Sequence, residues 1–205
     1  MKLNWSHIET SEVNGPGLRA VLWVQGCTHR CEGCFNKHTW PRVPVNLDEP
    51  ELAATILLGV AETNGCEGIT ISGGEPLQQA IQVRELIRFV KKENPELSVV
   101  MFTGYTWEEV QAHESRKNAI EQVDILIAGR YDRLVPQVHE WAGSGNQTVH
   151  HLTGRYQERL TPKKTTQFEI HVTSEGIVAS GFPTEKALSA LGAMSRDSES
   201  VGPGE

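Results

Sequence analysis

The segment Gly68-Ile-Thr-Ile-Ser-Gly-Gly-Glu-Pro76 predicts a short buried strand that runs directly into a glycine-rich loop. Residues 18–25 show the same order, because their alternating apolar residues predict a strand and the loop from Gly26 to Gly33 follows at once. Two further strands are predicted later in the chain, over 97–103 and 123–129. We therefore expect four strands in the first 130 residues.

Apolar residues at helical spacing predict a helix in each interval between these strands. The first helix covers about 49–63, with Asp48 and Glu51 as a capping box and an apolar face of Leu52, Ile56 and Val60. The second helix ends at Asn94-Pro95, and its apolar stripe consists of Ala80, Val83, Ile87 and Val90. A short third helix follows the capping-box pair Thr106 and Glu109. Alternation of strand and helix predicts a parallel α/β sheet.

The regular alternation stops at about residue 130. Residues 155–167 are polar and resemble a linker, and residues 168–179 predict a β-hairpin with its turn at Ser174-Glu-Gly176. The last residues have no apolar periodicity. We expect a core over 1–154, a hairpin extension over 155–183 and a flexible tail over 184–205.

The charge balance excludes some classes of partner. The 205-residue chain has 19 basic and 26 acidic side chains, a net charge of −7, so no overall positive field attracts nucleic acid or an anionic membrane. Its apolar stretches fall far short of the roughly 18 residues that a spanning helix needs. The start MKLNWSHIET has no apolar signal segment. We therefore expect a cytoplasmic protein with no nucleic-acid or membrane partner.

Three of the four cysteines, Cys27, Cys31 and Cys34, lie within eight positions of the loop after the first strand. Such clustering favours metal binding over disulfides, and Gly26 and Gly33 allow the loop to curl so that the three sulfurs converge. Two kinds of site remain open. A structural zinc site would need a fourth ligand, such as His29, His38 or Cys66. An iron–sulfur cluster would keep one iron without a protein ligand.

The segment Cys27-Thr-His-Arg-Cys31-Glu-Gly-Cys34, with Asn36 and Trp40 after it, resembles the cluster loop of the radical SAM superfamily, specifically of the anaerobic ribonucleotide reductase activating proteins. Five other segments resemble that family in the same order along the chain: Asn14 to Arg19, Ser72 to Leu77, Phe102 to Tyr105, Val123 to Gly129 and Gly143 to Gln147. The resemblance covers roughly residues 10–150. Gly33 stands where an aromatic residue is common elsewhere in the superfamily, a departure that the activating proteins share.

This resemblance implies a fold, two cofactors and a set of site residues. The fold would be a partial, open (β/α) TIM-like barrel of the radical SAM type with a small C-terminal β extension. Cys27, Cys31 and Cys34 would bind three irons of a 4Fe-4S cluster, and S-adenosyl-L-methionine (SAM) would chelate the fourth. The SAM pocket would comprise Gly73, Gly74, Glu75, Phe35, Thr103 and Gly104, with the Glu75 carboxylate facing the amino group of SAM. A buried turn explains Thr103 and Gly104 equally well.

The implied reaction is the reductive cleavage of SAM to a 5′-deoxyadenosyl radical, which would abstract hydrogen from a glycine and leave a glycyl radical. The partners would be a large anaerobic ribonucleotide reductase subunit and a low-potential electron donor such as flavodoxin or ferredoxin. Two alternatives remain open. One is a radical SAM enzyme that modifies a small molecule or a peptide, and the other is a zinc-binding interaction module or electron carrier.

Four further residues have a structural interpretation beside a functional one. Asp124 and Arg130 flank the fourth strand and face either the pocket or structural partners. His29 is interpreted as a solvated side chain or as a donor behind the ligands. Cys66 is interpreted as a small buried apolar residue.

Overall fold

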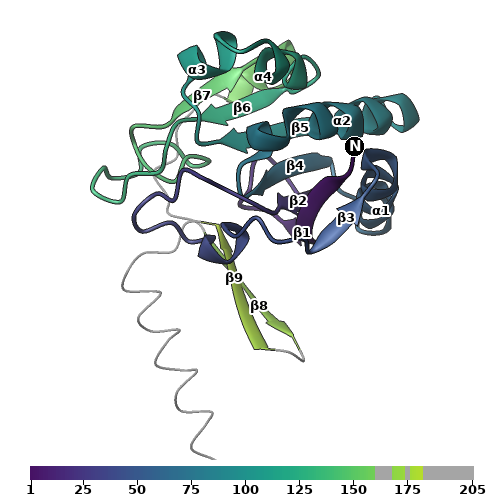
Figure 1. Cartoon of the computed structure of the whole chain (residues 1–205), viewed down its shortest axis with the longest axis horizontal. Coiled ribbons are helices and arrows are strands. Elements are labelled where there is room, and N and C mark those ends of the chain that lie inside the picture. Colours follow the sequence, from purple (N-terminus) through teal and green to yellow (C-terminus); the bar gives the residue numbers. More distant parts are fainter. Residues whose placement is uncertain (160–167, 174–175, 182–205) are drawn as a thin grey trace, which may run out of the picture.

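The fold is built on one seven-stranded sheet, in a computed structural model that describes residues 1–159, 168–173 and 176–181 (Figure 1). The strand order is β3-β1-β2-β4-β5-β6-β7. The bounds are β1 Leu3–Ser11, β2 Arg19–Val24, β3 Asn46–Asp48, β4 Gly68–Gly73, β5 Ser98–Thr103, β6 Ile125–Ala128 and β7 Thr148–His151. The four central strands β2, β4, β5 and β6 run parallel, which confirms the four predicted strands.

The sheet is mixed rather than purely parallel. Strands β1, β3 and β7 pair antiparallel with their neighbours, and none of them is predicted from the sequence. The register of β1 shifts between Trp5 and His7, so an irregularity interrupts the alternation that would reveal a strand. Strands β3 and β7 have only three and four residues, too few to show a period. Because β3 and β7 are the two edges, the sheet is open in the part of the chain that the structure describes.

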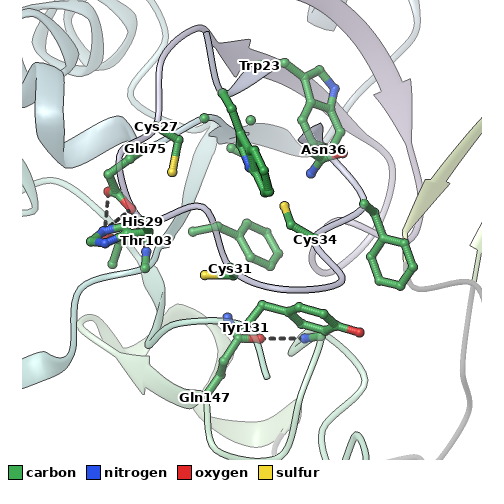
Figure 2. A pocket seen from close by; sticks show the side chains of 18 of the residues that line it. Trp23, Cys27, His29, Cys31, Cys34, Asn36, Glu75, Thr103, Tyr131 and Gln147 are labelled. Carbon is green, nitrogen blue, oxygen red and sulfur yellow. Dashed lines mark hydrogen bonds and ion pairs between the residues drawn. The ribbon is translucent and has the colours of Figure 1, made fainter. Parts of the chain in front are cut away.

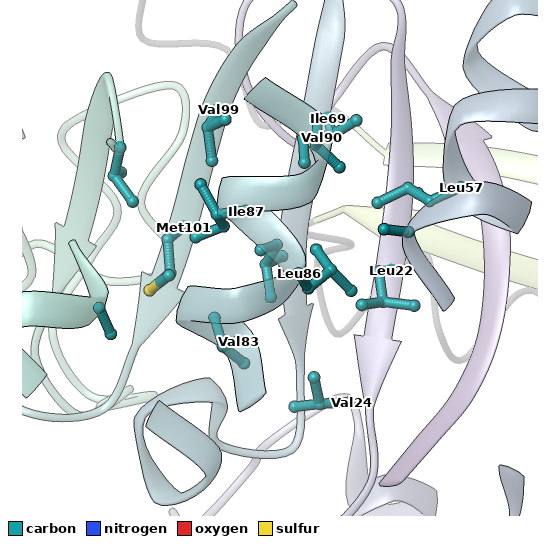
Figure 3. Close-up of a cluster of buried hydrophobic side chains, with 14 of the residues drawn as sticks. Leu22, Val24, Leu57, Ile69, Val83, Leu86, Ile87, Val90, Val99 and Met101 are labelled. Atoms are coloured by element: carbon teal, nitrogen blue, oxygen red, sulfur yellow. The ribbon is translucent and has the colours of Figure 1, made fainter. Parts of the chain in front are cut away.

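Helices cover one face of the sheet and enclose the main core (Figures 1 and 3). Their bounds are α1 Pro50–Thr63, α2 Ala80–Glu93, α3 Trp107–Gln111 and α4 Glu114–Ala119, with short 3-10 helices η1 Lys37–Thr39, η2 Pro76–Gln79 and η3 Gly154–Arg159. The predicted stripe of α2 is confirmed, because all four of its residues are buried together with Leu86. Among the described residues, no helix has the length and apolar character needed to cross a membrane.

The predicted apolar face of α1 is wrong for two of its three residues. Leu52 and Ile56 are 51% and 40% exposed, whereas Val60 is partly buried against the core. The residues that face the sheet are Ala53, Ala54, Leu57 and Ala61. The sequence of α1 offers two apolar faces, and the structure buries the one whose small alanines allow the helix to approach the strands closely.

The two predicted capping boxes have different outcomes. Thr106 and Glu109 form a complete capping box at the start of α3, as predicted. The box predicted for α1 is absent, because Glu49 is the N-cap residue and makes no side-chain hydrogen bond there. Asp48 instead ends β3, and its carboxylate accepts a hydrogen bond from Trp5 Nε1 at 3.0 Å.

A buried arginine joins the amino ends of the parallel strands. Arg19 is fully buried, and its guanidinium donates to the Thr70 and Ser98 hydroxyls and to three backbone carbonyls, those of Pro16, Ile69 and Ser98. Tyr156 Oη hydrogen-bonds to the same Ser98 hydroxyl at 2.8 Å. The start of the predicted linker is therefore structured, because Tyr156 is buried against the sheet within η3.

The last described segments form a second, two-stranded sheet. Strands β8 Phe168–Thr173 and β9 Gly176–Gly181 pair antiparallel, which confirms the predicted hairpin. The backbone N–H of Glu12 donates to the Glu169 carboxylate at 2.6 Å and ties the hairpin to the loop after β1. Residues 174–175 of the predicted turn and the expected tail over 184–205 lie outside the described residues.

Candidate functional site

One cavity lies where the carboxyl ends of the four parallel strands meet (Figure 2). The loops after β2, β4, β5 and β6 all contribute to its lining, and it encloses about 850 Å³ with its open mouth included. This end of a parallel sheet is where α/β proteins bind ligands. The structure brings together every site residue expected from the sequence: Cys27, Cys31, Cys34, Phe35, Gly73, Gly74, Glu75, Thr103 and Gly104.

The cysteine loop curls through two glycines in left-handed backbone conformations. Gly26 has φ +103° and Gly33 has φ +76°, which residues with a side chain rarely adopt. The backbone N–H groups of Gly26 and Cys27 donate to Thr39 and Trp40, so the loop closes on the following helix η1. The expected curl of the loop is therefore present, and its cysteines lie around one cavity.

The three cysteines are free thiols that line the same cavity (Figure 2). Burial raises the pKa of the Cys27 thiol, while hydrogen bonds from the backbone N–H groups of Arg30 and His29 act in the opposite direction. Burial also raises the pKa of the Cys31 thiol. Because iron binds thiolates, loading this site with metal would release protons.

The donor set fits an iron–sulfur cluster with one open iron. Cys27, Cys31 and Cys34 are the only cysteines among the described lining residues. Of the three candidates for a fourth zinc ligand, Cys66 packs against the hydrophobic core, His38 is exposed outside the cavity lining, and the His29 side chain faces Glu75. Within the described ranges, no three His, Cys, Asp or Glu side chains are close enough together to hold a single metal ion.

Gly73 and Gly74 bring the loop after β4 into direct contact with the loop after β2. A Cβ atom on Gly73 would lie 2.6 Å from the backbone nitrogen of Val24, and one on Gly74 would collide with the carbonyl oxygen of Gly26. Gly74 N–H and Glu75 N–H donate to the carbonyls of Val24 and Gly26 at 2.8 and 2.9 Å. The two loops that the sequence singles out are thus joined backbone to backbone.

The Glu75 carboxylate is buried, with 1% of the residue exposed, and both oxygens contact protein donors (Figure 2). Oε1 accepts hydrogen bonds from Leu77 N–H at 2.9 Å and from the Thr103 hydroxyl at 2.7 Å. Oε2 accepts one from Gly104 N–H at 2.6 Å and lies 3.4 Å from His29 Nε2. Glu75 therefore joins the ends of β4 and β5 to the cysteine loop.

Several lining residues were not expected from the sequence. Tyr131, in the loop after β6, lies 5.5 Å from Phe35 between ring centroids and encloses the cavity from that side. The Gln147 side chain accepts from Gly143 N–H and donates to the Gly129 carbonyl, both at 2.8 Å, and holds the loop after β6 in place. Tyr131 could have been predicted as a lining residue from its position directly after a parallel strand, because the other loops that line the cavity also follow parallel strands.

The charged residues near β6 are paired. Arg130 binds Glu109 through two hydrogen bonds of 2.8 and 3.0 Å, and these bonds with one from Thr106 N–H lower the pKa of Glu109 to about 2. Asp124 is buried at the opposite end of the strand, where it accepts from Val99 N–H at 2.8 Å and lies 3.4 Å from Lys91 Nζ. Of the two roles considered for Asp124, facing the pocket or binding structural partners, the structure supports the second.

Comparison with known proteins places the chain in a family. The model of the 4Fe-4S single cluster domain matches residues 13–150. The anaerobic ribonucleoside-triphosphate reductase-activating protein of Enterobacteria phage T4 is 36% identical over 139 residues, which are 67% of this chain and 86% of that protein. The chain belongs to this family of activating proteins.

Other activating proteins are similar to this chain to the same degree. Those of Vibrio cholerae and Escherichia coli K12 are 34% and 35% identical, over 69% and 68% of this chain and 92% of their own length. The solved structure of QueE from Escherichia coli aligns with a TM-score of 0.40 and 18% identity, over 52% of this chain and 54% of that one.

The hairpin lies beyond the part of the chain that matches the 4Fe-4S single cluster domain. The family model ends at residue 150, whereas β8 begins at Phe168. The hairpin nevertheless reaches the site, because Gly181 at the end of β9 is part of the cavity lining. In this activating protein the cavity therefore has one lining residue, Gly181, outside the range that the family model matches.

Proposed function

We propose that this protein binds a 4Fe-4S cluster and SAM and generates a glycyl radical on an anaerobic ribonucleotide reductase. One observation carries the proposal: three thiols of one loop face a cavity that the loop after β4 also lines, at the carboxyl ends of parallel strands. Bound together, the two cofactors would supply an electron and a 5′-deoxyadenosyl radical. Membership of the activating-protein family supports the choice of reductase as substrate.

The residues of the chain would bind, orient and shield these groups. Cys27, Cys31 and Cys34 would each bind one iron. Gly73, Gly74, Glu75, Phe35, Thr103 and Gly104 would form the SAM pocket. Since the Glu75 carboxylate already contacts four protein groups, we infer that it serves SAM mainly by fixing the backbone of the two adjoining loops. Aromatic rings of Trp23, Phe35 and Tyr131 would exclude water from the cavity.

The open sheet is, in this proposal, a partial barrel of the radical SAM type whose open side admits a polypeptide. We propose residues 1–154 as the radical SAM core and 155–183 as an extension anchored by Tyr156. A reductase segment would enter beside the hairpin, because Gly181 lies on the cavity lining. A low-potential electron donor such as flavodoxin or ferredoxin would complete the reaction, and the cytoplasm is the compartment that we propose.

A second candidate keeps the radical chemistry and changes the substrate to a small molecule or a peptide. The hairpin favours it, because Gly181 at its end is part of the cavity lining and lies outside residues 13–150, which the family model matches. The two candidates differ in a direct assay. Formation of 5′-deoxyadenosine that depends on a small molecule, with no response to any reductase, would replace the first proposal by the second.

Anaerobic reconstitution followed by electron paramagnetic resonance (EPR) tests the proposal. We expect a brown protein with about four irons, a cluster signal that SAM perturbs, and a glycyl doublet once the reductase and a reductant are added. Cys31→Ala should lose the cluster and SAM cleavage. Cys66→Ala, a matched control outside the cavity, should retain both. A colourless protein with one bound zinc would overturn the radical proposal and support a zinc-binding interaction module.

A further inference from the structure

In the sequence, His29 lies midway between the proposed ligands Cys27 and Cys31. Its side chain is nevertheless buried, with only 8% exposed. The imidazole meets the Tyr105 ring edge-on, with centroids 4.6 Å apart and an interplanar angle of 78°. It also lies directly on Gly104, where an added Cβ would be 2.5 Å from His29 Cδ2. Its Nε2 atom is 3.4 Å from Glu75 Oε2 (Figure 2).

The Tyr105 ring also contacts a cation. The Arg116 guanidinium lies 3.6 Å from the centroid of the Tyr105 ring. The contacts of His29 therefore connect the cysteine loop to the end of β4 through Glu75 and to the segment after β5 through Gly104 and Tyr105. A glycine at 104 is required for this packing, which gives that residue a structural reason besides the SAM pocket.

The backbone next to His29 adopts a conformation that needs such support. Arg30 has φ +49°, the one positive value at a non-glycine residue in the described ranges. A residue with a side chain stays in this strained region only where its surroundings hold it there. The backbone N–H groups of His29 and Arg30 face the Cys27 thiol, where they oppose the rise in its pKa that burial causes. Consecutive N–H groups around a left-handed residue form a concave site for negative charge.

We propose that His29 is a positioning residue: by its contacts with Glu75, Gly104 and Tyr105, it holds two backbone N–H groups on the Cys27 sulfur and thereby sets the reduction potential of the bound cluster. This inference rests on the proposed function, since it requires a cluster on Cys27. Hydrogen bonds to a ligand sulfur stabilise the reduced cluster, which carries one more negative charge. Their loss should make the cluster harder to reduce.

Three substitutions separate the contributions of the ring and of the contact with Glu75. His29→Ala removes both. His29→Phe keeps a ring against Gly104 and Tyr105 but contributes no polar atom. His29→Gln places an amide donor near the position of Nε2 and keeps the contact with Glu75. His38→Ala is the matched control, because His38 is an exposed histidine shortly after the same loop.

The measurement is a redox titration of the reconstituted proteins at one pH, followed by EPR, with iron content determined on the same samples. We expect His29→Ala to shift the potential to more negative values by about 59 mV or more, a tenfold change in the reduction equilibrium of a one-electron couple. The potentials of His29→Gln and His38→Ala should stay near that of the wild-type protein. The potential of His29→Phe should lie between those of His29→Ala and the wild-type protein.

Two results would overturn the inference. One is an unchanged potential in His29→Ala with its full iron content, and the other is equal potentials in His29→Gln and His29→Phe. The comparison of His29→Gln with His29→Phe tests the inference even if His29→Ala holds no iron. The proposed function fails separately, if the wild-type protein itself binds no four-iron cluster.

Discussion

Glu75 offers the most direct test of how the site is organised, because two roles for it predict different behaviour in the protein without cofactors. If Glu75 only contacts SAM, Glu75→Gln should leave the stability of the cofactor-free chain unchanged. If it joins the two loops, the same substitution should destabilise that chain. The structure favours the second outcome, since the carboxylate accepts three hydrogen bonds from Leu77, Thr103 and Gly104.

The size of the effect follows from the donors around each oxygen. At the Oε2 position a glutamine NH₂ group would face Gly104 N–H at 2.6 Å, donor against donor. The NH₂ group should therefore occupy the Oε1 position, where the Thr103 hydroxyl can rotate to accept but Leu77 N–H loses its acceptor. One unsatisfied buried N–H costs about 1–3 kcal/mol, and the remaining bonds lose their charge assistance. We expect a total loss of about 2–4 kcal/mol.

Urea unfolding of the cofactor-free protein measures this loss, and thermal unfolding should show a fall of about 4 to 16 °C, at about 2–4 °C per kcal/mol. Thr103→Val tests the same contact from its other side. The two substitutions should be non-additive, because they share one hydrogen bond. A change below about 0.5 kcal/mol in Glu75→Gln, the size of an ordinary surface substitution, would refute the organising role and favour direct contact with SAM.

Three further predictions concern other parts of the molecule. Arg19→Met should lower the free energy of unfolding by about 3–5 kcal/mol, because it leaves buried acceptors without a donor, and a urea midpoint equal to wild type would contradict this. Hydrogen bonds from Arg130 and, to a lesser extent, from Thr106 N–H lower the pKa of Glu109 from 4.5 to about 2, so these bonds stabilise the fold above pH 4.5 and their contribution is lost as the pH falls toward 2. Glu109→Gln should flatten the pH dependence of unfolding in that window, and an unaltered profile would exclude the pair as its source. Ile170→Asp, on the hairpin, should weaken activation of the reductase, whereas Ile81→Asp, of similar exposure on the outer side of α2, should not; equal effects on glycyl-radical yield would remove the hairpin from the interface.

The parts of the fold that the sequence predicted are those with local signals. Strands β2, β4, β5 and β6 are continuous apolar segments that end in glycine or polar loops. The capping box of α3 needs only Thr106 and Glu109, three residues apart. In contrast, β1 was missed because its irregular register breaks the alternation, and the buried face of α1 was misassigned because two faces are apolar.

The site residues also divide into those that have a local sequence signal and those that do not. Three cysteines in one short loop, and two glycines and a glutamate in another, are recognisable wherever the loops end up. The roles of Glu75 and His29 were not recognisable, because their contacts join residues far apart in the sequence. Glu75 binds Thr103, 28 positions later, and His29 contacts both Glu75 and Tyr105. Tyr131 lines the cavity because β6 pairs parallel with β5, which places the loop after β6 beside the other lining loops.

The sequence by itself determined the chemistry that the protein can perform, since residue type and short-range spacing define the thiol ligands and the strand-to-loop transitions. Tertiary structure decided which of these groups meet, how the Glu75 carboxylate distributes its hydrogen bonds, and where the hairpin touches the cavity. The physical reason is that thiol chemistry and loop curvature are properties of a few consecutive residues. Burial, hydrogen-bond partners and the position of a cavity wall depend on strand order and register, which are settled only when the whole sheet packs.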